Sequence, residues 1–189
     1  MMNASSEEMK APITLGNFEE LPEEDGYKLE LVRGFVVREP RPMPLHGRIA
    51  ARLTRFLDEH VDASECGVVL VEVDFLLTEQ PPTVRAPDIA FVSTGRLPRE
   101  PYAPAYWRFA PDLAVEILSP ANRAAEMQHK VLEYLDAGSR LVWVIDPERR
   151  TAVSHGSRTD ARPLGLDEAL SGGEVLPGFH LPLAQLFDL

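Results

Sequence analysis

The length, composition and charge of the chain limit the class of protein that it can be. With 189 residues, 44% of them hydrophobic and 26% charged, the chain fits one domain that buries roughly 70% of its unfolded surface, and neither a disordered nor a fibrous protein is indicated. The formal net charge of −11 excludes the globally basic surface that proteins use to bind nucleic acid nonspecifically.

The sequence indicates neither a membrane protein nor a disulfide-bonded one. Residues 1–10 are polar and acidic, and no later stretch approaches the ~20 apolar residues that span a bilayer, so we expect a cytoplasmic protein without a membrane partner. Cys66 is the single cysteine, which excludes an intrachain disulfide and a cysteine-cluster metal site. Because no activating histidine pattern accompanies Cys66, a buried or bystander thiol is favoured over a nucleophile.

The N-terminal quarter predicts an arm followed by a β-hairpin. We expect residues 1–15 to form a flexible arm and residues 16–189 to form a single domain, with a short helix or turn near residues 17–21. Two β-rich runs, at residues 27–32 and 35–39, flank an Arg-Gly turn and therefore predict a hairpin.

A helix, a strand and a loop are expected next. After His46, apolar residues recur at the spacing of an amphipathic helix that reaches about residue 61. These apolar residues are Ile49, Leu53, Phe56 and Leu57. The β-branched run at residues 68–77 predicts one strand, and the proline-rich stretch at residues 80–87 predicts a loop.

Two apolar runs each carry one acid. Asp88 stands at the start of the apolar run 89–92, and Glu116 stands inside the apolar run 113–118. An ionised carboxylate loses its hydration shell on burial, so Glu116 requires a cationic partner, for which a divalent metal ion and a lysine are the candidates. The proline-rich and aromatic segment 93–111 between them predicts a long loop, either functional or a simple connection.

The C-terminal part completes an α/β pattern. A helix is predicted from Ser119-Pro120 to the residue before Gly138, and Lys130 lies beside its apolar face. Strands are predicted at residues 141–146 and 151–155, and residues 165–189 predict a short strand, a Gly-Gly turn and a terminal helical segment. This order predicts an α/β fold in which a mixed central β-sheet is flanked by helices.

The ordered motifs resemble the Uma-two family of restriction endonucleases, a branch of the PD-(D/E)XK nuclease superfamily. The resemblance runs from about Tyr27 to Val153. Its markers are LELVRG at 29–34, the helix start at His46, APDIAFV at 86–92, VEILSP at 115–120, Lys130, Tyr134, Gly138, Trp143 and Asp146-Pro147. The resemblance implies a restriction-endonuclease-like core preceded by the N-terminal hairpin, and it implies a nuclease that cleaves nucleic acid, which we expect to be DNA.

The same resemblance assigns a catalytic set. The two acids and the lysine of the superfamily fall on Asp88, Glu116 and Lys130. The superfamily usually carries its lysine two residues after the second acid, where this chain has Leu118. The resemblance therefore implies that the lysine is supplied from the following helix, as Lys130.

Elementary chemistry supports a metal ion at these residues. Phosphodiester hydrolysis brings two anions together, so it needs a hard cation that neutralises the phosphate and activates water. Asp88 and Glu116 offer oxygen ligands suited to Mg²⁺ or Mn²⁺, and the carbonyl of Ile117 is an additional candidate ligand. Lys130 would orient or deprotonate the water, or hold the phosphate as a point charge.

Glu30 and His46 are further candidates for the catalytic set. Glu30 could add a carboxylate to the metal or could be an exposed strand residue. His46 could contact phosphate or shuttle a proton, or could start its helix without a catalytic part. Arginines gather around residues 38–55 and 96–108, where they form either a local positive rim or ordinary solvated charge.

Three readings stay open besides the nuclease. The charged trio could be a buried ion pair that stabilises the sheet. The protein could be a noncatalytic nucleic-acid- or protein-binding module that keeps the nuclease fold, which the acidic charge and the displaced lysine favour. It could also be a self-associating accessory protein, since apolar hairpins and an aromatic loop can form a homodimer contact.

Overall fold

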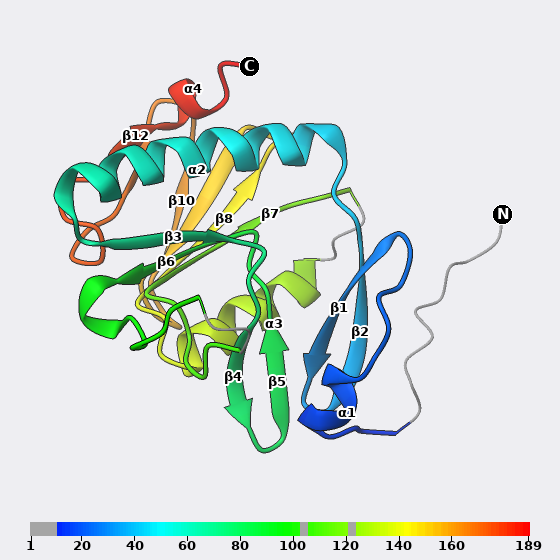
Figure 1. The fold of residues 1–189 in the computed structure, drawn as a ribbon. Coiled ribbons are helices and arrows are strands. Elements are labelled where there is room, and N and C mark those ends of the chain that lie inside the picture. The colour runs from blue at the N-terminus through cyan, green and yellow to red at the C-terminus, as the bar shows by residue number, and fades with distance from the viewer. Residues whose placement is uncertain (1–10, 103–105, 121–123) are drawn as a thin grey trace, which may run out of the picture.

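The computed structural model describes residues 11–102, 106–120 and 124–189, which form a six-stranded, a four-stranded and a two-stranded β-sheet together with two main helices (Figure 1). The helices are α1 (Leu15–Glu19), α2 (Pro44–Ser64), α3 (Ala124–Asp136), α4 (Leu183–Leu186) and the 3-10 helix η1 (Thr94–Arg96). The strands are β1 (Tyr27–Val32), β2 (Phe35–Pro40), β3 (Gly67–Val71), β4 (Phe75–Glu79), β5 (Pro82–Arg85), β6 (Ile89–Ser93), β7 (Leu113–Ile117), β8 (Leu141–Asp146), β9 (Thr151–His155), β10 (Ala161–Leu164), β11 (Ala169–Ser171) and β12 (His180–Pro182).

The central sheet is mixed, as the sequence predicts. Its order is β10-β9-β8-β7-β6-β3, and the pairing of β7 with β8 is parallel whereas its other pairings are antiparallel. Figure 1 shows α2 and α3 on opposite sides of this sheet. The α/β core with a mixed sheet flanked by helices is therefore confirmed.

The residue alternation of β7 explains how the sheet divides the core. Val115 and Ile117 pack in the cluster that contains the apolar face of α2, and Ala114 packs in the cluster that contains the apolar face of α3. Successive side chains of a strand point to opposite faces, so Glu116 points to the α3 side together with Ala114. Both faces of β7 are buried, so the side chain of Glu116 is largely shielded from water.

A second sheet, in the order β2-β1-β5-β4, packs beside the first. The hairpin predicted at its start is confirmed, with Tyr27 paired to Pro40 and Val32 paired to Phe35. Its two turn residues both have positive φ, 52° at Arg33 and 85° at Gly34. A Cβ on Gly34 would lie 2.9 Å from Cβ of Pro12, so both the turn and the close approach favour glycine.

The single strand expected at residues 68–77 is wrong. The chain instead forms β3 and β4 in different sheets, because Glu72 takes a left-handed conformation with φ of 53° and the chain turns before Phe75. Apolar periodicity continues through the break, so the pattern did not reveal it. The break carries Glu72 and Asp74 to the junction between the two sheets.

Two further expectations need correction. The proline-rich stretch 80–87 was expected to be a loop, but it contains β5, whose buried Val84 pairs with Leu31 of β1 and Leu76 of β4. Burial of Val84 thus outweighs the weak strand propensity of the prolines around it. Strand β10 was also not predicted from the sequence, and it pairs with β9 through residues 161–164.

The ends of the predicted helices and arm are only partly tested. Helix α2 begins at Pro44, where proline occupies the first turn, and α3 ends before Gly138, whose φ is 105°. The predicted start of that second helix, Ser119-Pro120, is not helical, and α3 is described from Ala124, since residues 121–123 lie outside the described residues. Most of the predicted arm, residues 1–10, is outside them too, and the division into arm and single domain stays a prediction.

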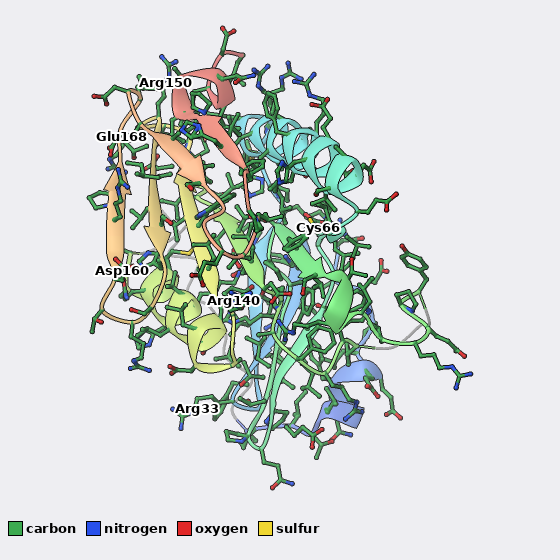
Figure 2. All side chains as sticks on the ribbon, turned by 90° about the vertical axis from the view of Figure 1, so that its left-hand side faces the viewer. Arg33, Cys66, Arg140, Arg150, Asp160 and Glu168 are labelled. Carbon is green, nitrogen blue, oxygen red and sulfur yellow. The ribbon has the colours of Figure 1, made fainter. Side chains whose placement is uncertain are left out.

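The C-terminal segment closes the α2 side of the core. Leu176, Phe179 and Leu181 pack in the same cluster as α2, and the ring of Phe179 stacks on Trp143 at 5.7 Å. Figure 2 shows Arg150 near α4, where its guanidinium donates to the carbonyl of Phe187. Within the described part of the chain, no helix has the length and apolar character of a membrane span.

Candidate active site

The pairing of β6 with β7 brings the two predicted acids together. Ile89 pairs with Val115, so the next residue on each strand places Asp88 opposite Glu116. Residues that face each other across an antiparallel pair project from the same side of the sheet. The backbone N–H of Ile117 donates to Asp88 Oδ2 at 2.6 Å, which fixes this carboxylate at the end of β7.

His46 orients Asp88 from the start of α2. Its Nε2 lies 3.1 Å from Asp88 Oδ2, and the histidine is buried. Burial alone would raise the pKa of Asp88, but the hydrogen bonds from His46 and from the Ile117 N–H lower it overall. The Asp88 carboxylate therefore stays ionised at neutral pH, and His46 contacts an acid of the site.

Lys130 reaches Glu116 from α3, as the sequence predicts. Its Nζ lies 3.1 Å from Glu116 Oε2, 3.2 Å from Glu30 Oε1 and 3.0 Å from Glu39 Oε1. Three carboxylates from β1, β2 and β7 thus surround one ammonium. Tyr134, one helical turn further along α3, donates its hydroxyl to Glu116 Oε1 at 2.7 Å.

Burial and mutual electrostatic interaction shift the pKa values of the ammonium and the carboxylates in this cluster. Burial would lower the pKa of Lys130, but the surrounding carboxylates outweigh it and raise the pKa, so the ammonium stays charged. Burial raises the pKa of Glu116 to about 7, where the charge of Asp88 adds to the rise and Lys130 opposes it. Burial likewise raises the pKa of Glu39.

Glu30 lies behind the site as part of a buried ion network. It is fully buried, which excludes the reading as an exposed strand residue. Arg85 NH1 donates to Glu30 Oε2 at 2.5 Å, the N–H of Ala86 donates to Glu30 Oε1 at 3.0 Å, and Arg85 also contacts Glu133. Burial would raise the pKa of Glu30, but Lys130 and Arg85 lower it overall.

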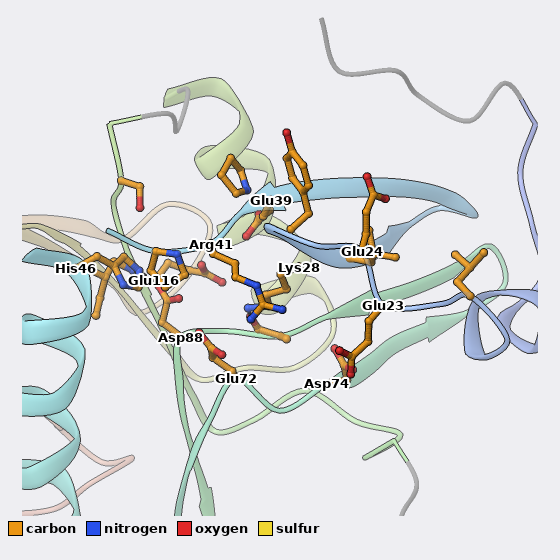
Figure 3. A pocket seen from close by; sticks show the side chains of 18 of the residues that line it. Glu23, Glu24, Lys28, Glu39, Arg41, His46, Glu72, Asp74, Asp88 and Glu116 are labelled. Carbon is orange, nitrogen blue, oxygen red and sulfur yellow. Dashed lines mark hydrogen bonds and ion pairs between the residues drawn. The ribbon is translucent and has the colours of Figure 1, made fainter. Parts of the chain in front are cut away.

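A pocket of about 680 Å³ opens where the two sheets meet. Asp88, Glu116, Ile117 and His46 line it, whereas Glu30 and Lys130 do not. Figure 3 shows His46, Asp88 and Glu116 at one end of the pocket, Lys28 and Arg41 in the middle, and Glu23, Glu24 and Asp74 at the other end. The pocket therefore has two acidic ends, and the two cations in its middle lie beside the carboxylate of Glu39, which also lines it.

Comparison with known proteins identifies the family. Residues 15–184 match the family model of Uma2, described as "Putative restriction endonuclease". The chain belongs to the Uma2 family. Its fold is similar to the crystal structure of "a putative nuclease belonging to DUF820" from Anabaena variabilis ATCC 29413, with a TM-score of 0.82, 24% identity, and coverage of 93% of this chain and 98% of that one. No curated protein matches the chain.

The Uma2 site contains residues that sequence reasoning missed. Lys28 faces Glu39 in the β1–β2 register and donates its ammonium to the carbonyl of Ala86. Lys28 and Glu30 are two residues apart on β1, so the strand period alone could have placed both on one face. Arg85 gave no such signal, because its strand was expected to be a loop.

The arginines of this Uma2 chain do not form a free positive rim. Several are held by carboxylates or carbonyls of the protein itself. These pairs are Arg38 with Glu24, Arg52 with the Gln185 carbonyl, Arg55 with Glu59, Arg96 with Asp112, and Arg108 with Glu79. Arg41, which belongs to the predicted rim, lines the pocket together with Lys28.

Proposed function

We propose that this Uma2 protein is a metal-dependent nuclease that hydrolyses phosphodiester bonds, with DNA as its substrate. The description of its family and the fold that it shares with a protein described as a nuclease support this activity. The observation that carries the proposal is the juxtaposition of Asp88 and Glu116 at one end of a pocket, with the Lys130 ammonium 3.1 Å from Glu116.

The donor set fits Mg²⁺ or Mn²⁺. Among the residues that the structure describes, no three His, Cys, Asp or Glu side chains form a metal cluster of their own. Mg²⁺ does not need such a cluster, because proteins commonly hold it through one or two carboxylates while water and substrate phosphate fill its other positions. Asp88 and Glu116 supply the two carboxylates, and the Ile117 carbonyl is the additional donor that we assign to the site.

Each residue then has a distinct part in hydrolysis. The bound ion would neutralise the phosphate and lower the pKa of a water molecule. His46 and the Ile117 N–H hold the Asp88 carboxylate in one orientation. Lys28 and Arg41, in the middle of the pocket, offer positive charge to a phosphate beside the acids.

Lys130 acts through its charge in this scheme. A general base must lose its proton near neutral pH, but the three carboxylates around Lys130 raise its pKa. Its buried ammonium instead keeps Glu116 in place and offsets the repulsion between Glu116 and Asp88. Tyr134 gives Glu116 a second fixed contact.

Cleavage assays test the proposal. Purified protein is incubated with DNA and with RNA in Mg²⁺, in Mn²⁺ and in EDTA, and wild type is compared with Asp88→Ala and Glu116→Ala. We expect cleavage that needs the metal and falls at least ~100-fold in either variant, since metal catalysis contributes several kcal/mol. Glu79→Gln is the control, because this exposed glutamate lies outside the pocket. Cleavage that survives both alanine changes would contradict the proposal.

A noncatalytic binding module is the second candidate. The observation in its favour is the net charge of −11 together with arginines that pair within the protein. A module would bind nucleic acid or protein with the same affinity in EDTA and in Mn²⁺, and Asp88→Ala would leave that affinity unchanged. Metal-independent binding without cleavage of DNA or RNA would select this candidate.

We also propose a homodimer in the cytoplasm, which stays a prediction from the sequence. Exposed apolar side chains on and after the hairpin that lie outside the pocket lining are the candidate contact, and they are Phe35 and Leu45. Light scattering coupled to gel filtration checks the dimer. A mass of 21.0 kDa at micromolar concentration would contradict it.

A further inference from the structure

The pocket continues well beyond the two catalytic acids, and its far end has a different chemistry. The turn between β3 and β4 brings Asp74 to this end. A parallel bridge joins Phe75 to Trp107, and the N–H of Leu76 donates to the Trp107 carbonyl at 2.9 Å, so the preceding residues Asp74 and Tyr106 lie beside each other. Both line the pocket.

The far end combines aromatic and apolar walls with the carboxylates of Asp74, Glu23 and Glu24. Phe18, Leu21 and Pro22 line it with Tyr106. Within the described part of the chain, the carboxylate of Asp74 has neither a hydrogen bond nor an ion pair to another residue. Burial raises the pKa of Asp74 to about 6, so the group is an anion at pH 8 and still accepts hydrogen bonds.

This end is unsuited to a phosphate but suited to a nucleobase. The carboxylates of Asp74 and Glu23 repel an anion, whereas Lys28 and Arg41 attract one in the middle of the pocket. A base is neutral, stacks on aromatic rings, and carries N–H donors on its pairing edge. The order along the pocket is therefore a place for the scissile phosphate, a place for a second anion, and a place for a base.

We propose that the pocket takes an unpaired nucleotide, with its base against Tyr106 and Asp74, so that the substrate of this protein is single-stranded nucleic acid. The inference rests on the proposed nuclease function and adds the substrate class. A base inside a duplex has both faces stacked and its pairing edge occupied, so it can neither stack on Tyr106 nor donate its N–H groups to Asp74. A pocket of about 680 Å³ has the size of a small-molecule site and is too small for a duplex.

Two circular DNAs of one sequence provide the first test. One is a single-stranded circle and the other a relaxed, covalently closed duplex, so neither has ends. We expect the single strand to be cut at least ~10-fold faster, because stacking of a base on an aromatic ring is lost in the duplex. Equal rates on the two circles, or a faster rate on the duplex, would overturn the inference while leaving a nuclease that depends on Asp88. Absence of any Asp88-dependent cutting would overturn the nuclease proposal and this inference with it.

Binding provides a second test that does not need catalysis. Asp88→Asn protein is titrated with a single-stranded oligonucleotide that contains fluorescent 2-aminopurine. We expect Tyr106→Ala to weaken binding on the order of 10-fold, and Tyr106→Phe to recover most of that loss, because the ring stacks without its hydroxyl. Tyr102→Ala is the matched control, since Tyr102 belongs to the same loop, is 80% exposed and does not line the pocket.

A conservative change covers the case in which Tyr106→Ala does not fold. Asp74→Asn keeps the shape of the side chain but removes the charge that accepts N–H donors. We expect it to weaken binding of the same oligonucleotide on the order of 5-fold or more, because hydrogen bonds to charged groups are the stronger ones. Unchanged binding in Asp74→Asn, together with equal rates on the two circles, would show that no base enters this end.

Discussion

Lys130 holds Glu116 from behind the pocket. Its Nζ lies 3.1 Å from Glu116 Oε2, yet only 3% of the lysine side chain is exposed, and Glu116 but not Lys130 lines the cavity. Under the proposed function, the lysine would therefore influence a bound ion or phosphate only through the carboxylate that it contacts. Lys130 is therefore placed to position Glu116, whereas Asp88 and Glu116 are placed to face whatever enters the pocket.

Loss of Lys130 should destabilise the fold. Lys130→Met leaves three buried or half-buried carboxylates without their shared cation, and breaking such a pair costs about 3–5 kcal/mol. The loss should be larger at pH 8 than at pH 5, because the pKa of Glu116 is about 7 and its carboxyl is neutral at the lower pH. Urea unfolding at both pH values measures the difference.

Arg140→Met is the matched control for that measurement. Arg140 is 51% exposed, and its partner Glu174 is 97% exposed at 3.8 Å. An exposed pair of this kind contributes at most ~1 kcal/mol, so this change should leave stability nearly unaltered at both pH values. A similar loss of unfolding free energy in both variants would show that the buried contacts of Lys130 stabilise the fold no more than an exposed ion pair does.

Metal affinity should rise with pH through neutrality. The ion and a proton compete for Glu116, whose pKa burial raises to about 7. Below that pH the carboxyl is protonated, so each unit of falling pH weakens binding up to ~10-fold, and above it the affinity levels off. Calorimetric titration with Mn²⁺ at pH 6 and pH 8 checks the direction. Equal affinities at the two pH values would exclude Glu116 as a ligand that titrates.

Tyr134→Phe should move that pH dependence upward. The Tyr134 hydroxyl donates to Glu116 Oε1 at 2.7 Å and so stabilises the ionised carboxylate. Without this donor the pKa of Glu116 rises further, and the midpoint of Mn²⁺ affinity shifts above about 7. The same change should cost about 1 kcal/mol of stability. A midpoint that moves downward would contradict the role given to Tyr134.

Acid stability should depend on Glu30. Lys130 and Arg85 lower its pKa below the ordinary 4.5 despite full burial, so the folded state binds its proton less readily than the unfolded state. The stabilisation is then present above pH 4.5 and is lost as the pH falls below it. Glu30→Gln should be about 3–5 kcal/mol less stable at pH 7 and should lose less stability between pH 4.5 and pH 3 than wild type. Parallel curves for the two proteins would refute this account.

The sequence predicted the main elements because their patterns are local. The spacing of Ile49, Leu53 and Leu57 identified α2, and the apolar runs around Asp88 and Glu116 identified β6 and β7. The resemblance added the link between these strands and Lys130, whose sequence distance from Glu116 no local pattern bridges. Family membership confirms that resemblance, while the catalytic roles stay proposals.

The parts that escaped prediction depend on contacts between distant segments. The turn at Glu72 has no apolar signature, and β5 becomes a strand only because Val84 is buried between β1 and β4. Arg85 could not be matched with Glu30 for the same reason, since their contact spans 55 residues. Tyr106 reaches Asp74 through one isolated bridge, which no periodicity reveals.

Titration with Mn²⁺ tests directly whether Asp88 and Glu116 form a metal site. Wild type, Asp88→Asn and the control Glu79→Gln are titrated with Mn²⁺ at pH 8, and bound metal is followed by calorimetry or by the spectrum of the free ion. We expect one site in wild type and in Glu79→Gln, with affinity at least ~10-fold weaker in Asp88→Asn, since the ion needs the carboxylate beside Glu116. Equal affinity in all three proteins, or no binding in wild type, would contradict it.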